Sequence, residues 1–85
     1  MILIDANLLI YASDKFSDFH LNAKRWLDGR LTEGVRVGLP WPSLLAFLRV
    51  VTNPRIYTQP ASTTDAWDQV RAWLSRDVVW VPQPT

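Results

Sequence analysis

Hydrophobic residues occur along the chain in short runs and one-sided stripes separated by polar breaks. Residues 1–4 are continuously apolar, which is typical of a strand covered on both faces. Residues 35–39 and the apolar run 78–81 are expected to form a second and a third strand. The short apolar stretch 8–12 predicts a first helix. Longer segments with apolar positions every three or four residues predict helices over 19–33, 41–52 and 64–75.

Local signals mark the expected ends of the longer helices. Asp18 is expected to cap the second helix through its side chain, and Gly34 is expected to end it. Pro42 suits the first turn of the third helix because its missing N–H is not needed there. Thr63 or Thr64 is expected to cap the fourth helix.

Two of the helices carry apolar stripes that are expected to face the core. In both stripes the aromatic residues are interpreted as packing residues. The stripes comprise Phe19, Ala23, Trp26, Leu27 and Leu31 in the second helix and Ala66, Trp67, Val70, Trp73 and Leu74 in the fourth.

The order strand, helices, strand, helices, strand predicts an α/β fold with parallel strands joined by right-handed crossovers. The 85 residues carry nine Lys or Arg against eight Asp or Glu and no cysteine. This balance excludes a polybasic arm, a disulfide framework and a thiolate metal site. We find no membrane-length apolar run and no basic leader, so a cytoplasmic protein without membrane attachment is expected.

Asp5 is the first candidate for chemistry. It follows the first apolar run, which is expected to be the central strand, and ligands of open α/β sheets collect beyond the carboxyl ends of strands. A role as cap of the next helix is equally compatible with its position. Asn7 is interpreted as a capping group or as a residue supporting Asp5.

Two segments resemble a known family. The opening Met-Ile-Leu-Ile-Asp-Ala-Asn at 1–7, with Leu-Leu-Ile-Tyr-Ala at 8–12, looks like the start of PIN-domain proteins. Residues 38–41 and the stretch Phe-Leu-Arg-Val-Val-Thr-Asn-Pro-Arg at 47–55 are similar to VapC toxins. The resemblance implies a three-layer α/β/α fold around a parallel sheet and an endoribonuclease dependent on Mg²⁺ or Mn²⁺. It also implies RNA as substrate, a VapB-type antitoxin as partner and a homodimer.

The acidic cluster that the resemblance implies is incomplete. Asp5 matches the family's first metal-binding Asp, and Asn7 matches the polar residue that often follows it. The family's second acid is expected near Ala46, or less well near Pro42, yet no Asp or Glu occurs between Glu33 and Asp65. We therefore expect residues 1–85 to be a single PIN-like domain, incomplete at its C-terminus and inactive alone. A downstream segment, or another chain in a complex, would then supply the missing acids.

The alternative is a catalytically dead remnant that acts as an antitoxin-binding or oligomerisation module. The surplus of aromatic residues over what so short a chain can bury fits either interpretation. A phosphoacceptor domain is disfavoured because no acidic cluster surrounds Asp5.

Other polar residues have ordinary structural interpretations. Arg49 and Arg55 flank a turn and could contact RNA phosphates or an antitoxin carboxylate. His20 is interpreted as a helix-surface residue. Structural roles are also favoured for the remaining acids, Asp14, Asp18, Asp28, Glu33, Asp65, Asp68 and Asp77.

Overall fold

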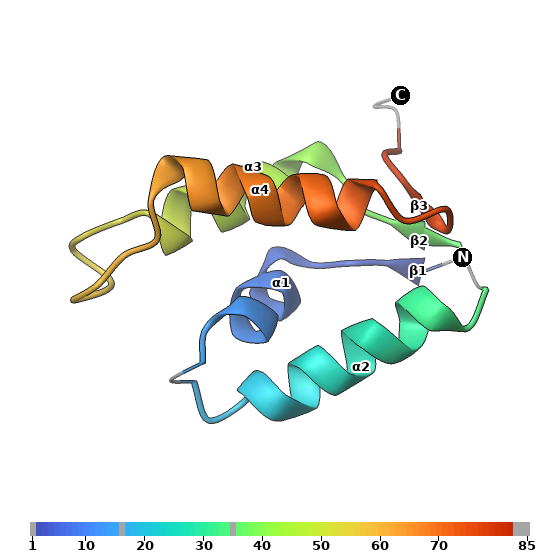
Figure 1. Ribbon diagram of the computed structural model, residues 1–85, viewed down its shortest axis with the longest axis horizontal. Coiled ribbons are helices and arrows are strands. Elements are labelled where there is room, and N and C mark those ends of the chain that lie inside the picture. The colour runs from blue at the N-terminus through green and yellow to red at the C-terminus, as the bar shows by residue number, and fades with distance from the viewer. Residues whose placement is uncertain (1, 16, 35, 83–85) are drawn as a thin grey trace.

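Three short parallel strands alternate with four helices along the chain. The computed structural model describes residues 2–15, 17–34 and 36–82 (Figure 1). The expected α/β class with a parallel sheet is confirmed. The elements are β1 (Ile2–Leu3), α1 (Ala6–Ser13), α2 (His20–Thr32), β2 (Val37–Gly38), α3 (Trp41–Val51), α4 (Thr63–Leu74) and β3 (Val79–Trp80).

The strand order is β1-β2-β3, so β2 is the inner strand of the described sheet. Leu3 pairs with Gly38, which in turn pairs with Trp80. The expectation that the first strand is central is therefore wrong for the described residues. Continuous apolarity reports what covers the faces of a strand and carries no information about neighbours along its edges. The faces of β1 are themselves only partly covered, because Leu3 is 58% exposed.

Gly38, which has no side chain, allows neighbouring segments of the same chain to approach β2 closely. A Cβ atom added there would lie 2.6 Å from Leu3 Cδ2 and 3.3 Å from Pro82 Cγ. The missing side chain thus leaves room for Leu3 and Pro82 to lie against the inner strand.

Helices lie on both sides of the strands in Figure 1, with α3 and α4 on one side and α1 and α2 on the other. α1 packs against α2 and also against α3. The core contains Phe47 and Trp73, whose rings meet edge to face with centroids 5.0 Å apart. The other members of the buried cluster are Ile4, Leu9, Leu27, Leu31, Val37, Leu39, Leu44, Val51, Ala66 and Val70.

The helix ends differ from expectation by one or two residues. Phe19, not Asp18, is the N-cap residue of α2, and its N–H donates to Ser17 Oγ at 3.1 Å. Ser62 caps α4 by accepting a hydrogen bond from the Asp65 N–H at 3.0 Å. Gly34 follows the end of α2 with φ of +76°, a left-handed conformation that favours glycine, as expected.

Two tryptophans that were expected to pack in the core lie at its margin. Trp26 is 39% exposed and Trp67 is 36% exposed, whereas Trp73 is buried. Phe19 is 60% exposed. The buried positions are Ala23, Leu27 and Leu31 in α2 and Ala66, Val70 and Trp73 in α4, and Phe19 precedes α2. None of the helices in the described part of the chain has the length and apolarity that a membrane span requires.

Candidate functional site

Asp5 lies between the end of β1 and the start of α1. Its backbone is extended, with φ of −79° and ψ of 152°, and it occupies the N-cap position of α1. Its carbonyl oxygen accepts hydrogen bonds from Leu8 N at 3.2 Å and Leu9 N at 3.5 Å. Its side chain makes no cap hydrogen bond and is exposed. The backbone of Asp5 therefore starts the helix while the carboxylate stays available.

The register of the sheet defines what lies beside Asp5. Ile4 N donates to Gly38 O at 3.0 Å, which places the end of β1 beside the end of β2. α3 begins at Trp41, so its first turns follow the same carboxyl edge of the sheet. Asn7 lies in the first turn of α1 and is exposed.

The positions where a second acid was expected carry no oxygen ligand. Ala46 is half-buried in α3, and Pro42 is exposed in its first turn. Over residues 2–15, 17–34 and 36–82 no group of three or more His, Cys, Asp or Glu side chains could hold a metal ion. Mg²⁺ is usually held by one or two carboxylates with substrate phosphates and water. Asp5 alone therefore offers at most a weak site for a divalent cation.

The structure does not bring Asp14 to Asp5. Asp14 follows the last residue of α1 and Asp5 precedes its first, so the eight-residue helix separates them by about 12 Å. Asp18 is exposed in the turn before α2. Neither therefore joins Asp5 at the edge of the sheet.

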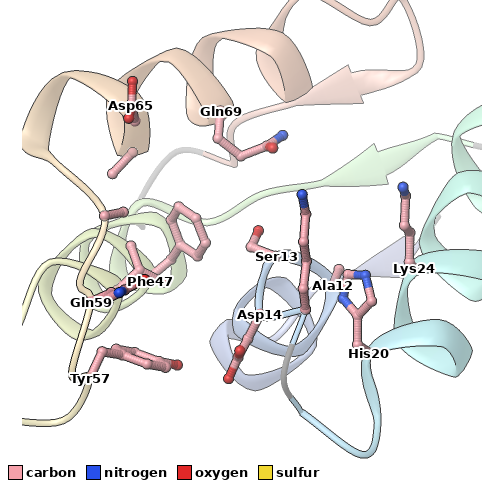
Figure 2. Close-up of a pocket in the computed structure, with 14 residues that line it drawn as sticks. Ala12, Ser13, Asp14, His20, Lys24, Phe47, Tyr57, Gln59, Asp65 and Gln69 are labelled. Carbon is pink, nitrogen blue, oxygen red and sulfur yellow. The ribbon is translucent and has the colours of Figure 1, made fainter.

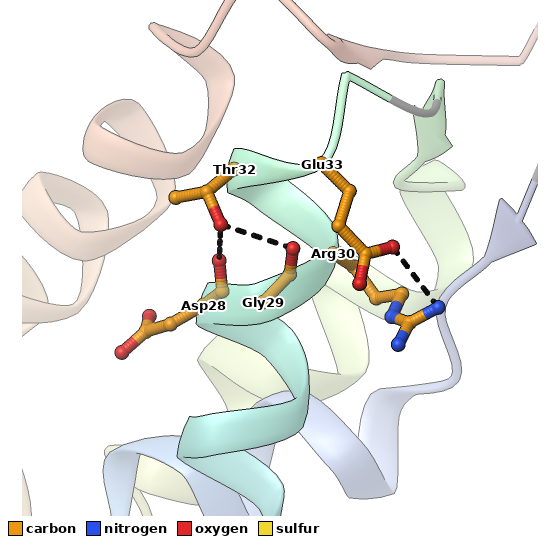
Figure 3. Close-up of polar contacts among 5 residues, drawn as sticks. All are labelled: Asp28, Gly29, Arg30, Thr32 and Glu33. Atoms are coloured by element: carbon orange, nitrogen blue, oxygen red, sulfur yellow. Dashed lines mark hydrogen bonds and ion pairs between the residues drawn. The ribbon is translucent and has the colours of Figure 1, made fainter.

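The remaining acids for which the structure gives contacts stabilise helices. Asp68 pairs with Arg71 at 3.3 Å within α4, and Asp65 lies in the first turn of that helix. Figure 3 shows the end of α2, where Glu33 pairs with Arg30 at 3.1 Å. These acids have the structural roles that the sequence favoured.

Arg49 and Arg55 lie on the surface around the end of α3. Arg49 is in its last turn, and Arg55 lies in the turn beyond it. The Arg55 backbone N–H donates to Asn53 Oδ1 at 2.9 Å, which fixes that turn. Both side chains are exposed, so a contact with an anionic partner remains a prediction.

The sequence interpretation missed a pocket of about 430 Å³ at the far end of α1. Figure 2 shows His20 and Lys24 on the side formed by α2, with Asp65 and Gln69 facing them from α4. Its residues come from four helices and the loop before α4, and no motif links them. The lining residues are Ala12, Ser13, Asp14, Lys15, His20, Lys24, Phe47, Val51, Tyr57, Gln59, Ala61, Asp65, Ala66 and Gln69.

Two pocket residues have defined hydrogen bonds. His20 Nδ1 lies 3.0 Å from the Tyr11 carbonyl oxygen. Burial raises the pKa of Tyr57 above its ordinary value of 10.0, and Asp14, to which the Tyr57 hydroxyl donates, raises it further. His20 was interpreted as a helix-surface residue, whereas the structure places it half-buried at this pocket.

A second hollow, the aromatic notch, lies between α1 and α2. It is lined by Leu8, Tyr11, Phe19, Asn22, Ala23 and Trp26 and has a volume of about 340 Å³. The rings of Tyr11 and Phe19 lie 5.2 Å apart. Arg30 lies over the Trp26 ring at 5.4 Å. The notch accounts for several of the aromatic side chains that are not in the core.

Fold and site together define an α/β protein whose parallel sheet carries one available carboxylate at its carboxyl edge. Comparison with known proteins makes the class specific, although no family model matches the sequence. The chain is 39% identical to Ribonuclease VapC37 of Mycobacterium tuberculosis over 85 residues, which are 100% of the chain and 59% of that protein.

Two further relatives give the same result. Ribonuclease VapC33 of Mycobacterium tuberculosis is 40% identical over 76 residues, covering 89% of the chain and 53% of the relative. VapC ribonuclease Mb2897 of Mycobacterium bovis is 37% identical over 75 residues, covering 88% and 51%. The chain thus belongs to the VapC family of PIN-domain proteins. It spans between 51 and 59% of the length of these curated relatives.

Proposed function

We propose that this chain is part of the toxin of a type II toxin–antitoxin system, a Mg²⁺-dependent endoribonuclease of the cytoplasm with a VapB-type antitoxin as partner. One observation carries the proposal. Similarity to Ribonuclease VapC37 extends over the whole chain, and in that chain Asp5 lies exposed at the carboxyl edge of the sheet without a side-chain cap hydrogen bond. Metal dependence and the antitoxin come from the family resemblance.

The proposed architecture is a single three-layer α/β/α domain, PIN-like, over residues 1–85. Its support is the arrangement in Figure 1, where helices lie on both sides of the parallel strands. We further propose that, in a longer protein or a complex, another strand pairs with the outer edge of β1. β1 would then be an inner strand, and Asp5 would lie between strand ends on both sides.

We propose that the 85 residues alone do not cleave RNA. Asp5 offers one carboxylate, and the positions around Ala46 offer none. A divalent cation that neutralises charge on a scissile phosphate needs to be held firmly at the reacting group. The remaining acids must therefore come from further segments of the protein or from another chain.

The test uses Mn²⁺ as a paramagnetic probe together with an RNA cleavage assay. We expect no cleavage of single-stranded RNA by the chain with Mg²⁺ or Mn²⁺. We also expect Mn²⁺ to broaden amide NMR signals around Asp5, and the broadening to vanish in Asp5→Ala. Asp18→Ala is the matched control because Asp18 is equally an exposed carboxylate before a helix, and it should leave the broadening unchanged.

Two results would contradict the proposal. Broadening that survives Asp5→Ala would show that the cation collects elsewhere on the chain. RNA cleavage by the chain alone, lost in Asp5→Ala, would show that the described residues already complete a site.

The second candidate function is an antitoxin-binding module that no longer cuts RNA. The aromatic notch favours this second candidate. Tyr11 of α1 and Trp26 of α2 both line the notch, and both side chains are partly exposed. Aromatic side chains of this kind are enriched at the centres of interfaces. This candidate predicts that a longer protein or complex binds an antitoxin without cleaving RNA, whereas the first candidate predicts cleavage that is lost in Asp5→Ala, so an RNA cleavage assay separates the two.

A further inference from the structure

An exposed row of three side chains runs along one face of α3. Trp41, Leu45 and Arg49 follow one another at intervals of four residues, so they share a face of the helix. Trp41 is 41% exposed, Leu45 is 48% exposed, and Arg49 is exposed as well. The row is therefore open to a ligand along about 12 Å of the helix axis.

The row starts at the edge of the sheet where Asp5 lies. Leu3 pairs with Gly38 in the parallel register of β1 and β2. Two residues beyond each of them, Asp5 and Pro40 have extended backbones and occupy the N-cap positions of α1 and α3. Neighbouring strands lie about 4.8 Å apart. Trp41, the first residue of α3, thus follows a position that is equivalent to Asp5 on the adjacent strand.

No acidic residue occurs in α3 or in the loops on either side of it. The sequence contains no Asp or Glu between Glu33 and Asp65, and the same segment contains Arg36, Arg49 and Arg55. Within the part of the chain that the structure describes, Arg49 forms no ion pair. A planar guanidinium matches the geometry of a phosphate group, so Arg49 is available to an anionic ligand.

The carboxylates of α4 do not offset the charge of Arg49. Asp65 shares the pocket at the far end of α1 with Phe47 and Val51. Arg49 is two residues from each of these two, about 200° around the helix, so it projects from the opposite side of α3. Asp68 pairs with an arginine of its own helix.

The spacing of the row fits unpaired bases. Its members are separated by about 6 Å along the helix axis, whereas stacked bases of a duplex lie about 3.4 Å apart along each strand. The bases of a single strand can be splayed apart and stacked on aromatic side chains. Proteins that bind single strands combine such aromatic side chains with positive groups along the backbone. Trp41 supplies the aromatic face and Arg49 the positive group.

We propose that the row of Trp41, Leu45 and Arg49 holds single-stranded RNA, with one base stacked on the Trp41 ring and a phosphate bound by Arg49. The backbone beside the stacked base then lies next to Asp5. The choice of RNA rests on the proposed ribonuclease function. A stable protein interface buries about 800 Å² on each partner, which the two apolar side chains of the row do not provide.

The experiment measures fluorescence anisotropy of a labelled single-stranded oligoadenylate of about ten nucleotides, within the range of single-strand sites, mixed with the 85-residue chain and Mg²⁺. We expect Trp41→Leu to weaken binding about 5- to 20-fold through loss of one stacking surface. Trp41→Phe retains an aromatic face and should stay within about 3-fold of the parent chain. Arg49→Gln should weaken binding about 3- to 10-fold, the range for a charge-assisted contact.

The chain offers a matched control for each substitution. Trp67 is 36% exposed and lies in α4, whose start is beside the end of α3 because Ala61 N donates to Val51 O at 2.9 Å. Trp67→Leu should therefore change the affinity less than about 2-fold. Arg25 is exposed on α2, on the other side of the strands in Figure 1, and Arg25→Gln should also stay below about 2-fold, the effect of a screened distant charge.

A second measurement follows the Trp41 ring directly. Its indole N–H signal in the NMR spectrum is assigned by its absence in Trp41→Phe. We expect the oligoadenylate to shift this signal because a base stacks on the ring. An abasic oligonucleotide with the same number of phosphates should leave it in place. This comparison uses the parent chain, so it does not depend on the folding of a variant.

Several results would overturn the proposal. These are absence of RNA binding, equal losses in Trp41→Leu and Trp67→Leu, and an abasic oligonucleotide that binds as tightly as the oligoadenylate. A Trp41 signal that moves with protein concentration in the absence of RNA would identify the row as a contact between copies of the chain.

The outcome is separable from that of the proposed function. Broadening by Mn²⁺ at Asp5 together with full RNA binding by Trp41→Leu would refute the row alone. RNA binding that depends on Trp41, without Mn²⁺ broadening at Asp5, would refute the metal site alone. Trp41 and Arg49 are both exposed, so the far-UV circular dichroism of each variant should match that of the parent chain.

Discussion

Replacement of Asp5 by alanine separates the two roles considered for its carboxylate, helix cap and available ligand. A side-chain N-cap contributes about 1 kcal/mol to stability. Asp5 holds the N-cap position of α1 without a side-chain cap hydrogen bond, so this contribution is absent. What remains is the attraction between an exposed carboxylate and the helix N-terminus, about 0.3 kcal/mol. We expect Asp5→Ala to lower the free energy of unfolding by that amount, about 0.3 kcal/mol.

Ser62 provides the internal standard for this measurement. Its Oγ accepts a hydrogen bond from the Asp65 N–H at 3.0 Å, so it caps α4 through its side chain. Ser62→Ala should cost about 1 kcal/mol. In a domain of this size, 1 kcal/mol corresponds to about 4–8 °C in Tm, so the two variants should differ by several degrees.

Urea denaturation followed by tryptophan fluorescence is a suitable assay because Trp73 is buried in the core. Thermal unfolding followed by circular dichroism gives an independent value. The reasoning is refuted if Asp5→Ala destabilises the chain as much as Ser62→Ala does. The carboxylate would then be committed to α1, and its assignment to a metal would lose its structural support.

Three further predictions concern stability. Phe47→Ala should cost about 3–5 kcal/mol in urea denaturation, since Phe47 is 1% exposed and packs on Trp73, whereas Phe47→Leu should cost about 1 kcal/mol. Gly29→Ala should stabilise α2 by about 0.5–1 kcal/mol, because open space surrounds Gly29. Gly34→Ala should cost about 1–2 kcal/mol, because Gly34 has a φ of +76°. The two substitutions should therefore shift Tm in opposite directions. The raised pKa of Tyr57 favours the neutral phenol in the folded chain, so stability should hold below pH 10.0, the ordinary pKa, and fall as the pH rises through the raised value. Denaturation of Tyr57→Phe at several pH values should show that loss reduced.

The sequence predicted the element order and the α/β class because both follow from local pattern. Gly34 and Pro42 marked helix ends correctly, since each acts through its own backbone. The cap of α4 was placed wrongly because neighbouring residues offer the same side-chain chemistry. That of α2 was placed wrongly because the helix begins after Phe19, which makes no side-chain cap bond. At the start of α4 three successive hydroxyl residues, 62–64, could each cap, and only the backbone conformation selects Ser62.

The candidate site was predictable only in part. The position of Asp5 after an apolar run was enough to place it at the carboxyl edge of the sheet, and the structure adds that its side chain makes no cap bond. The position of β1 in the sheet depends on which strands pair with it, and that information is not local. The pocket at the far end of α1 was missed for the same reason: Lys15, Lys24 and Tyr57 are brought together by helix packing and share no sequence motif.

The exposure of Leu3 and the isolation of Asp5 have one physical cause. β1 pairs with β2 on one side, and no described strand lies along its other side. A strand at an edge leaves its outer backbone groups unpaired and its flanking side chains uncovered, which explains the 58% exposure of Leu3. It also leaves the end of β2 as the strand end beside Asp5. No described strand on the other side of β1 brings a further acid to Asp5. A strand pairing along that edge would cover Leu3 and supply positions for further ligands in one step, and for this reason burial of Leu3 and firm metal binding at Asp5 should appear together in a longer protein or a complex.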